Sequence, residues 1–464
     1  MSAVIVSQPS PSAHPGPRRP LAVGDPARIL AIAGDQRITL GTFFAQVRGL
    51  AACLPDAACA VNLCEDRYQF LVAFCAVAVR GQTTLLPPSR TRAAIDEVRV
   101  QHPDSYCLGD CAPCGCEAPS LSPLPHFVHM PDPLPLADGP PPTVDDAVLA
   151  AIGFTSGSTG GPLPNRKRWN GFRAGTAQNL AALAGLWPQD AGAEIVATVP
   201  PQHMYGMEMS VLFPLLAAAA VHAARPFFPG DIAAALRQTQ APRLLVTTPV
   251  HLRALLESTV ALPPLAGIVS ATAPLPQALA VAAEARFGCE VREVFGSTET
   301  CIIARRRTAH EQAWTPLPGV RLHPQPDGTQ VEGEHLDAPV VLSDLVELQA
   351  DGRFLLCGRR SDLLEIAGKR ASLGDLTRRL LAIPGVEDGV MLQLDECDAA
   401  GVRRIAALVV APDLDEAAIQ AALRRSVDPV FLPRRLRRVA VLPRNETGKL
   451  PRAALLRLLQ GGMQ

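Results

Sequence analysis

The sequence contains no apolar run long enough to cross a membrane. The longest candidate, residues 211–224, is interrupted by Pro214 and His222, whereas a membrane-spanning helix needs about 20 consecutive apolar residues. The first residues also lack the apolar core and cleavage site of a secretory signal peptide, because residues 7–20 are rich in Pro, Ser and Arg. We therefore expect a soluble, cytoplasmic protein.

An excess of charge of either sign is also missing. The chain has 43 Lys and Arg residues against 44 Asp and Glu residues, a net charge of −1, which gives no field to attract nucleic acid or an anionic membrane. Hydrophobic residues make up 48% and charged residues 19% of the chain, as in globular proteins. A length of 464 residues predicts two or more domains.

The 12 cysteines lack the even spacing of a disulfide framework and are typical of reduced thiols. The exception is a group of four within ten residues, Cys107, Cys111, Cys114 and Cys116. A structural zinc site usually has two Cys pairs separated by a longer loop. Metal binding by this group stays an alternative to four ordinary thiols.

Strand-like and helix-like segments alternate through most of the chain, which predicts an α/β fold with a parallel sheet. Many prolines in 103–147 predict an irregular connection there. From residue 318, short alternating strands indicate a small β subdomain, and the last hundred residues read as a compact α+β unit. The expected division is a disordered tail at 1–20, a large domain at 21–360 and a small domain at 361–464.

Residues 148–162 are an apolar run that breaks into consecutive small polar residues and glycines. The six are Thr155, Ser156, Gly157, Ser158, Thr159 and Gly160. They offer backbone N–H groups and hydroxyls with little side-chain bulk, which suits a polyphosphate. The spacing is not that of the GxxxxGK[ST] loop. An ordinary Gly/Ser turn between two strands is the alternative.

Five segments in sequence order resemble signatures of the adenylate-forming superfamily, which includes acyl- and aryl-CoA synthetases, luciferases and adenylation domains of peptide synthetases. They are TSGSTGGP, SATAPL at 270–275, FGSTE at 295–299, Ser343-Asp344 with Gly358-Arg359, and PRNETGK ending at Lys449. The resemblance runs from about residue 148 to 452. It implies a large N-terminal domain that binds ATP and an acid, followed by a small mobile C-terminal domain.

The resemblance also implies a reaction, in which ATP converts a carboxylic acid to an acyl-adenylate with release of pyrophosphate, before a thiol takes the acyl group. Thr298 and Glu299 would hold Mg²⁺ against the phosphates, and Lys449 would stabilise the charge at the reacting carboxylate. The loop above would bind nucleotide together with Lys167, Thr272, Ala273, Pro274, Phe295, Gly296, Ser297, Asp344 and Arg359. Phe295 would stack on adenine, and Asp344 would bind the ribose hydroxyls.

The chain departs from the family pattern at two positions. Leu163 stands where the phosphate loop usually has lysine, so Arg166 or Lys167 must substitute, and we favour Lys167. Ser361 occupies the hinge position, where Asp or Lys is usual, and Gly368 with Arg370 would line a tunnel for the thiol. These departures leave a second reading open, a non-catalytic relative that binds nucleotide.

The acid is predicted to bind among His203, Tyr205, Gly206 and Ser270. A histidine in such an apolar setting is often simply packed, so that its role stays open. The opening stretch from Val61 to Arg90 resembles the short ligases of bacterial aryl polyene pigment clusters, where a hydroxybenzoate-like or fatty acid is loaded onto a carrier protein. Aryl and long-chain pockets are lined by the same residue types. The predicted thiol partner is CoA or a phosphopantetheinyl acyl carrier protein.

Overall fold

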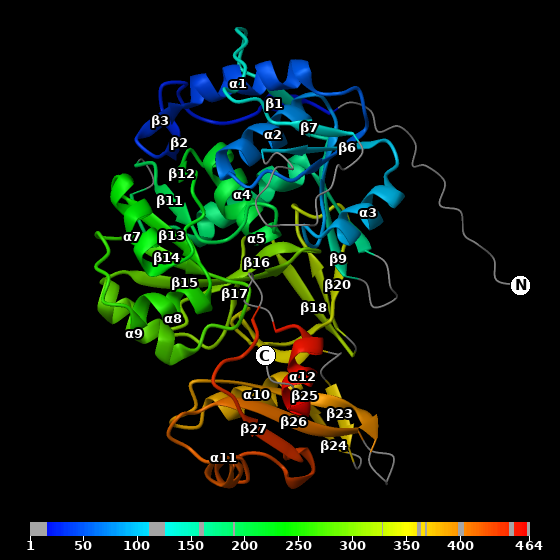
Figure 1. Cartoon of the computed structure of the whole chain (residues 1–464), viewed down its shortest axis with the longest axis vertical. Coiled ribbons are helices and arrows are strands. Elements are labelled where there is room, and N and C mark those ends of the chain that lie inside the picture. The colour runs from blue at the N-terminus through cyan, green and yellow to red at the C-terminus, as the bar shows by residue number, and fades with distance from the viewer. Residues whose placement is uncertain are drawn as a thin grey trace, which may run out of the picture.

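The computed structural model describes residues 16–110, 126–156, 162–188, 191–326, 328–359, 363–366, 369–397, 403–444 and 450–461. A large lobe contains the elements up to β22, and a smaller lobe, orange to red in Figure 1, contains the C-terminal elements. The mixed α/β architecture expected from the sequence is confirmed.

The phosphate-loop segment lies at the edge of a six-stranded sheet. Its strands, in spatial order, are β10 (Pro162–Arg168), β9 (Leu149–Ser156), β5 (Thr83–Leu86), β4 (Cys59–Asn62), β6 (Ser105–Gly109) and β7 (Phe127–His129). All neighbours are parallel except β9 and β10, which form a hairpin. The glycine-rich loop therefore joins two antiparallel strands.

A nine-stranded sheet forms the other half of the large lobe. Its order is β17 (Thr315–Pro316), β16 (Cys301–Arg306), β15 (Glu290–Ser297), β14 (Gly267–Ser270), β13 (Arg243–Thr247), β11 (Glu194–Ala197), β12 (Ala220–His222), β2 (Ile29–Ala33) and β3 (Gln36–Thr39). The strands from β15 to β2 are parallel. Their carboxyl ends therefore share one edge, where ligands bind in open α/β sheets.

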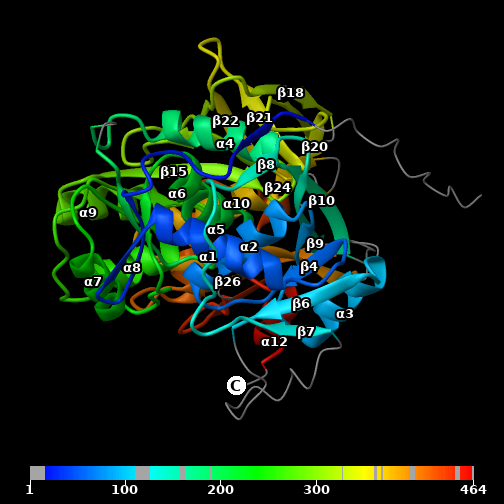
Figure 2. The ribbon, with the colours of Figure 1, turned by 90° about the horizontal axis from the view of Figure 1, so that it is seen from above.

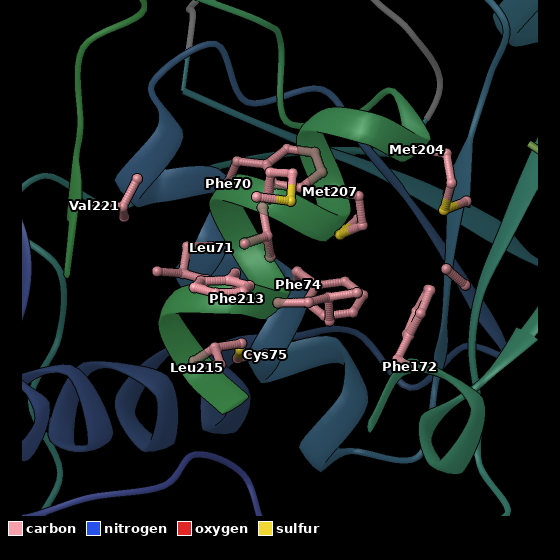
Figure 3. Close-up of a cluster of buried hydrophobic side chains, with 14 of the residues drawn as sticks. Phe70, Leu71, Phe74, Cys75, Phe172, Met204, Met207, Phe213, Leu215 and Val221 are labelled. Atoms are coloured by element: carbon pink, nitrogen blue, oxygen red, sulfur yellow. The ribbon is translucent and has the colours of Figure 1, made fainter. Parts of the chain in front are cut away.

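Apolar helices fill the space between the two sheets (Figure 2). They are α1 (Leu40–Cys53), α2 (Arg67–Val79), α4 (Trp169–Ala182) and the run α5 (Met204–Met207), π-helical η1 (Glu208–Leu212) and α6 (Phe213–Leu216). Thr39 is the N-cap of α1, and its hydroxyl accepts a hydrogen bond from the Thr42 N–H at 3.1 Å. Figure 3 shows Phe74 of α2 near Phe213 and Met207, so this core fixes α5 and η1 in place.

The outer helices are α3 (Arg92–Gln101), α7 (Pro229–Gln238), α8 (Pro249–Glu257) and α9 (Gln277–Phe287). A β region follows, with β18 (Arg321–Gln325), β19 (Gly328–Glu332) and β20 (Val340–Leu342) in one sheet and β21 (Asp344–Leu348) with β22 (Phe354–Arg359) in another. This region matches the short strands expected after residue 318.

The small lobe has its own apolar core, which includes Leu380, Ile405 and Leu423. Its elements are β23 (Leu363–Ile366), β24 (Lys369–Ser372), α10 (Leu373–Leu381), β25 (Asp388–Cys397), β26 (Arg403–Val410), α11 (Glu416–Leu423), the 3₁₀ turn Pro429–Phe431, β27 (Arg435–Arg438) and α12 (Arg452–Gln460). Arg253 of the large lobe donates to the Glu387 carbonyl at 2.7 Å, so the two lobes touch.

Two expectations about the N-terminal third need correction. Residues 18–20, placed in a disordered tail, form β1 (Arg18–Pro20), which pairs with β8 (Thr143–Asp145). Residues 103–147 are not irregular throughout, because β6 is a fully buried strand paired with β4. The strand was not recognised from the sequence because this short apolar segment stands within a proline-rich stretch.

The cysteine group is only partly described. Cys107 lies buried in β6, whereas Cys111, Cys114 and Cys116 fall outside the described residues. Within the described ranges, no three His, Cys, Asp or Glu side chains gather as metal ligands. No helix of the same ranges is long and apolar enough to cross a membrane.

Candidate active site

The FGSTE segment forms the turn between β15 and β16. Ser297 pairs with Cys301, and the Ser297 hydroxyl accepts a hydrogen bond from the Thr300 N–H at 3.2 Å. Gly296 lies so close to the opposite strand that a Cβ there would be 2.1 Å from the Cys301 carbonyl oxygen. Only glycine permits this approach, and the turn therefore presents Thr298 and Glu299 at its tip.

The strand that leads into the glycine-rich loop runs directly beside this turn. A Cβ on Gly153 of β9 would lie 2.9 Å from the Thr298 methyl group and 3.4 Å from the Met204 methyl group. Thr155 and Ser156 end β9, while Gly157, Ser158, Thr159 and Gly160 lie outside the described residues. Two segments separated by some 140 residues of sequence thus meet at one place.

Thr298 and Glu299 suit a hard divalent cation. Both residues are partly exposed, and neither side chain has a hydrogen bond or ion pair with another residue that the structure describes. A carboxylate and a hydroxyl are oxygen donors of the kind that Mg²⁺ prefers. The turn can therefore hold Mg²⁺ beside bound phosphates, and the magnesium role predicted for these residues fits their surroundings.

Lys167, the residue predicted to replace the phosphate-loop lysine, has a buried side chain in the structure. Its side chain is 6% exposed, and Nζ donates to the Glu299 carbonyl oxygen at 2.6 Å. The ammonium is therefore held against the backbone of the Thr298–Glu299 turn. Leu163, the residue in the usual lysine position, is 52% exposed and pairs with Thr155.

A carboxyl group is buried next to this lysine. Glu208 of η1 is 4% exposed and accepts hydrogen bonds from the Ile302 N–H at 3.1 Å and from the Asn179 amide at 3.1 Å. Burial raises the pKa of Glu208 from 4.5 to about 7, against the opposing effect of these hydrogen bonds and of Lys167.

The predicted acid-site residues lie at the carboxyl ends of β13 and β14. The Tyr205 hydroxyl donates to the Val269 carbonyl at 2.9 Å and approaches the Thr247 carbonyl at 3.3 Å. Burial raises the pKa of Tyr205 well above its usual value, so the phenol stays neutral. Ser270 ends β14 and is fully buried. His203 precedes α5, and Gly206 packs against the Pro200 carbonyl.

A partly open cavity of about 220 Å³ lies beside these strand ends. It is lined by Thr198, Pro200, Arg225 and Phe227. The ring of His251 lies 5.1 Å from that of Phe227, and its Nδ1 faces the Thr248 hydroxyl at 2.9 Å. Burial and the nearby Arg225 charge lower the pKa of His251. The sequence analysis did not single out Arg225, Phe227 or His251, although His251 follows a strand end closely.

The predicted adenine-binding segment follows β14. Thr272 has a left-handed backbone with φ of 79° and, like Pro274, is exposed, while Ala273 is partly exposed. The ring of Phe295 lies 5.5 Å from that of Trp314 and 6.3 Å from that of Phe354, and the side chain stays partly exposed. Because β14 and β15 are adjacent, this segment and Phe295 share the same sheet edge.

The pair predicted to grip the ribose is adjacent in space. Asp344 and Arg359 are paired directly across β21 and β22, and the Asp344 carbonyl accepts a hydrogen bond from the Thr329 hydroxyl at 2.7 Å. Arg370 belongs to β24, and its backbone lies opposite that of Glu365 in β23. Ser361, Gly368 and Lys449 lie outside the described residues.

Comparison with known proteins gives one consistent family. The profile of the "AMP-binding enzyme" family matches residues 21–331. A 4-coumarate–CoA ligase of Rhodobacter capsulatus is 34% identical over 64% of this chain and 74% of its own. A sulfoacetate–CoA ligase of Cupriavidus necator is 30% identical over 73% of this chain and 72% of its own.

Solved structures share the fold. The o-succinylbenzoate CoA synthetase of Bacillus subtilis in complex with an acyl-adenylate has a TM-score of 0.78 at 19% identity, covering 93% of this chain and 95% of that one. Its complex with ATP and magnesium ion has a TM-score of 0.76 at 18% identity, covering 92% and 96%. With the matching profile and these relatives, the chain belongs to the AMP-binding enzyme family, whose members use ATP to activate a carboxylic acid.

Proposed function

We propose that this protein joins an aromatic carboxylic acid to a thiol in two steps, through an acyl-adenylate. The observation that carries the proposal is the contact of Gly153 with Thr298, which sets the entry to the glycine-rich loop beside the Glu299 turn. Nucleotide phosphates and a metal-binding carboxylate would then meet at the sheet edge where the predicted acid site lies.

In the first step, a carboxylate oxygen of the acid attacks the α-phosphorus of ATP, and the bond to pyrophosphate breaks. In the second step, the sulfur of a thiolate attacks the acyl carbonyl carbon, and AMP leaves. Bound Mg²⁺ would neutralise phosphate charge during the first step. Thr298 and Glu299 would orient the phosphates through it, while Lys449 would stabilise the negative charge between acid and α-phosphate.

Two observations favour an aromatic acid over a long-chain one. The partly open cavity at the strand ends, about 220 Å³, is smaller than the roughly 300–1,000 Å³ of sites for drug-sized ligands. Its wall includes Phe227, whose ring makes an edge contact with His251. The 4-coumarate–CoA ligase among the relatives supports the same class of acid.

The acceptor thiol is proposed to be that of CoA, as the names of the relatives suggest. A phosphopantetheinyl carrier protein is the second candidate, since the stretch from Val61 to Arg90 resembles ligases that load such carriers. We also propose a cytoplasmic location, because the eight cysteines whose side chains the structure describes all carry free thiols, as in a reducing compartment.

Exchange of labelled pyrophosphate into ATP tests the first step. The acids to compare are benzoate, 4-hydroxybenzoate, 4-coumarate, octanoate and sulfoacetate. The proposal expects exchange with at least one aromatic acid and little with octanoate. Exchange with no acid, together with intact ATP binding, would favour the non-catalytic alternative. The acid that supports exchange is then offered with CoA and with a phosphopantetheinylated carrier, and thioester formation identifies the acceptor.

A further inference from the structure

Side chains from distant parts of the sequence hold the backbone of the Glu299 turn. Lys167 of β10 donates to the Glu299 carbonyl at 2.6 Å. His335, in the loop after β19, lies with Nε2 2.9 Å from the Thr300 carbonyl oxygen. The Glu208 carboxylate accepts the Ile302 N–H at 3.1 Å. Three backbone polar groups of the turn and of the first residues of β16 are thus held by side chains from three other segments.

All three side chains are buried, at 6% exposure for Lys167, 4% for Glu208 and 5% for His335. Burying a charged group costs several kcal/mol unless it is paired and hydrogen-bonded. Lys167 and Glu208 offset each other's charge within this interior. Apolar side chains would support an ordinary hairpin without this desolvation, so the presence of buried charges here needs a reason.

The turn itself adopts an uncommon backbone. Cys301 is a non-glycine residue with φ of 60°, in the left-handed region. Conformations of this kind cost about 1–3 kcal/mol and persist where the surroundings determine them. Gly296, at the bulge opposite, approaches Cys301 too closely for any side chain. The three buried side chains supply the determining surroundings.

We propose that Lys167, Glu208 and His335 form a clamp that fixes the backbone at Glu299, so that its carboxylate meets the magnesium of a bound nucleotide. Lys167 is then a positioning residue and not a phosphate ligand. This inference rests on the proposed function, because it assigns the clamp to the metal-binding turn of that reaction.

The position of Lys167 on β10 supports this assignment. The residue pairs with Ala151, near the base of the hairpin, whereas the loop tip follows Ser156. Its ammonium already donates to a carbonyl of the turn that carries Glu299. Moving it to the phosphates would break this contact and remove a positive charge that favours the ionised form of the buried Glu208.

The test compares the Lys167→Met/Glu208→Gln double variant with the wild-type protein. The double change removes both charges together, so no uncompensated charge is left in the interior, and the amide oxygen of the new glutamine side chain can still accept the Ile302 N–H. Glu208→Gln alone retains Lys167. Thr176→Val is the matched control, since Thr176 is similarly buried and its hydroxyl donates a hydrogen bond to the Phe172 carbonyl of its own helix.

The measurements are ATP affinity by calorimetry, with and without Mg²⁺, and pyrophosphate exchange over a range of Mg²⁺ concentrations. We expect the double variant to need at least about tenfold more Mg²⁺, a change worth about 1.4 kcal/mol. Its ATP affinity without Mg²⁺ and its KM for the acid should match those of the wild type. Thr176→Val should show the wild-type Mg²⁺ requirement.

Two results would overturn the clamp. One is a double variant with an unchanged Mg²⁺ requirement; the other is an equal loss of ATP affinity with and without Mg²⁺, which would make Lys167 a phosphate ligand. If the wild-type protein exchanges pyrophosphate with no acid, the proposed function fails instead. Calorimetry of Mg²⁺-dependent ATP binding would still decide whether the clamp exists.

Discussion

At the scale of single residues, two buried groups on either side of the Glu299 turn have pKa values displaced in opposite directions. Burial raises the pKa of Glu208 from 4.5 to about 7 and lowers that of His335 from 6.5 to about 4. Between about pH 4.5 and 6.5 the folded protein holds a proton at Glu208 that the unfolded chain has lost. In the same range the folded protein lacks a proton at His335 that the unfolded chain binds. The two effects on stability oppose each other.

The variant Glu208→Gln should separate the contribution of Glu208 to the pH dependence of stability from that of His335. The raised pKa of Glu208 makes the wild type lose stability as the pH rises from about 4.5 to 7. The free energy of unfolding of the variant, relative to the wild type, should therefore increase over that window, by up to about 1.4 kcal/mol per pH unit. The free energy of unfolding of His335→Gln, relative to the wild type, should increase as the pH falls from about 6.5 to 4. Urea unfolding at a series of pH values measures both, and parallel profiles for all three proteins would contradict the prediction.

Glu299→Gln tests the metal-binding carboxylate itself. The amide keeps the size of the side chain but removes the negative charge, so pyrophosphate exchange should fall by about 10² to 10³. Stability should hardly change, because the Glu299 carboxylate has no hydrogen bond or ion pair with another described residue. Glu334→Gln, an exposed carboxylate on the loop before His335, is the control. Equal activity of the two variants would remove Glu299 from the site.

The sequence predicts candidate site residues from short motifs, but it does not predict the buried side chains that hold them. Thr298, Glu299, Asp344 and Arg359 were assigned from short motifs, and the structure sets Asp344 opposite Arg359. The phosphate role of Lys167 was predicted from its neighbours in sequence, and those neighbours gave no sign of its hydrogen bond to Glu299, which is 132 residues away. Such buried polar contacts are non-local, and periodicity contains no information about them.

At the scale of elements, α5 depends on one glycine. A Cβ on Gly206 would lie 1.9 Å from the Pro200 carbonyl oxygen. Gly206→Ala must displace either α5 or the preceding turn, and it should destabilise the protein by about 1–3 kcal/mol or more. Gly230→Ala, in α7, meets nothing within 4 Å and should be neutral or stabilising by up to about 1 kcal/mol. Thermal unfolding of both variants measures the difference, and similar midpoints would contradict it.

Elements with a strong local signal were predicted well. The alternation of strand-like and helix-like segments in the sequence corresponds to β13, α8, β14, α9 and β15, which follow one another along the chain. β6 was missed because its five residues stand between proline-rich segments, and its burial comes from β4 and β7, which lie far away in sequence. Short buried strands have no periodicity of their own to reveal them.

At the scale of the whole molecule, the proposed function requires the motifs of the two lobes to cooperate, although few contacts join the lobes among the described residues. The Arg253 side chain reaches the Glu387 carbonyl, and α10 packs near β22. Interfaces of this limited kind permit relative domain motion. The sequence order of the motifs predicts that Lys449 belongs to the small domain and Glu299 to the large one, but their meeting depends on lobe orientation, which local sequence patterns do not encode.

If one lobe orientation serves adenylate formation and another serves thiol transfer, variants of the small domain should separate the two steps. Ser361→Pro fixes φ at the predicted hinge and restricts the preceding residue. It should leave pyrophosphate exchange nearly intact and abolish thioester formation. Lys449→Ala should do the reverse, with exchange reduced by about 10² to 10³ while a synthetic acyl-adenylate is still converted to the thioester. Comparing both rates in each variant measures this separation. A Ser361→Pro protein slowed equally in the two steps would place the pivot elsewhere, because a hinge is needed only for the change between them.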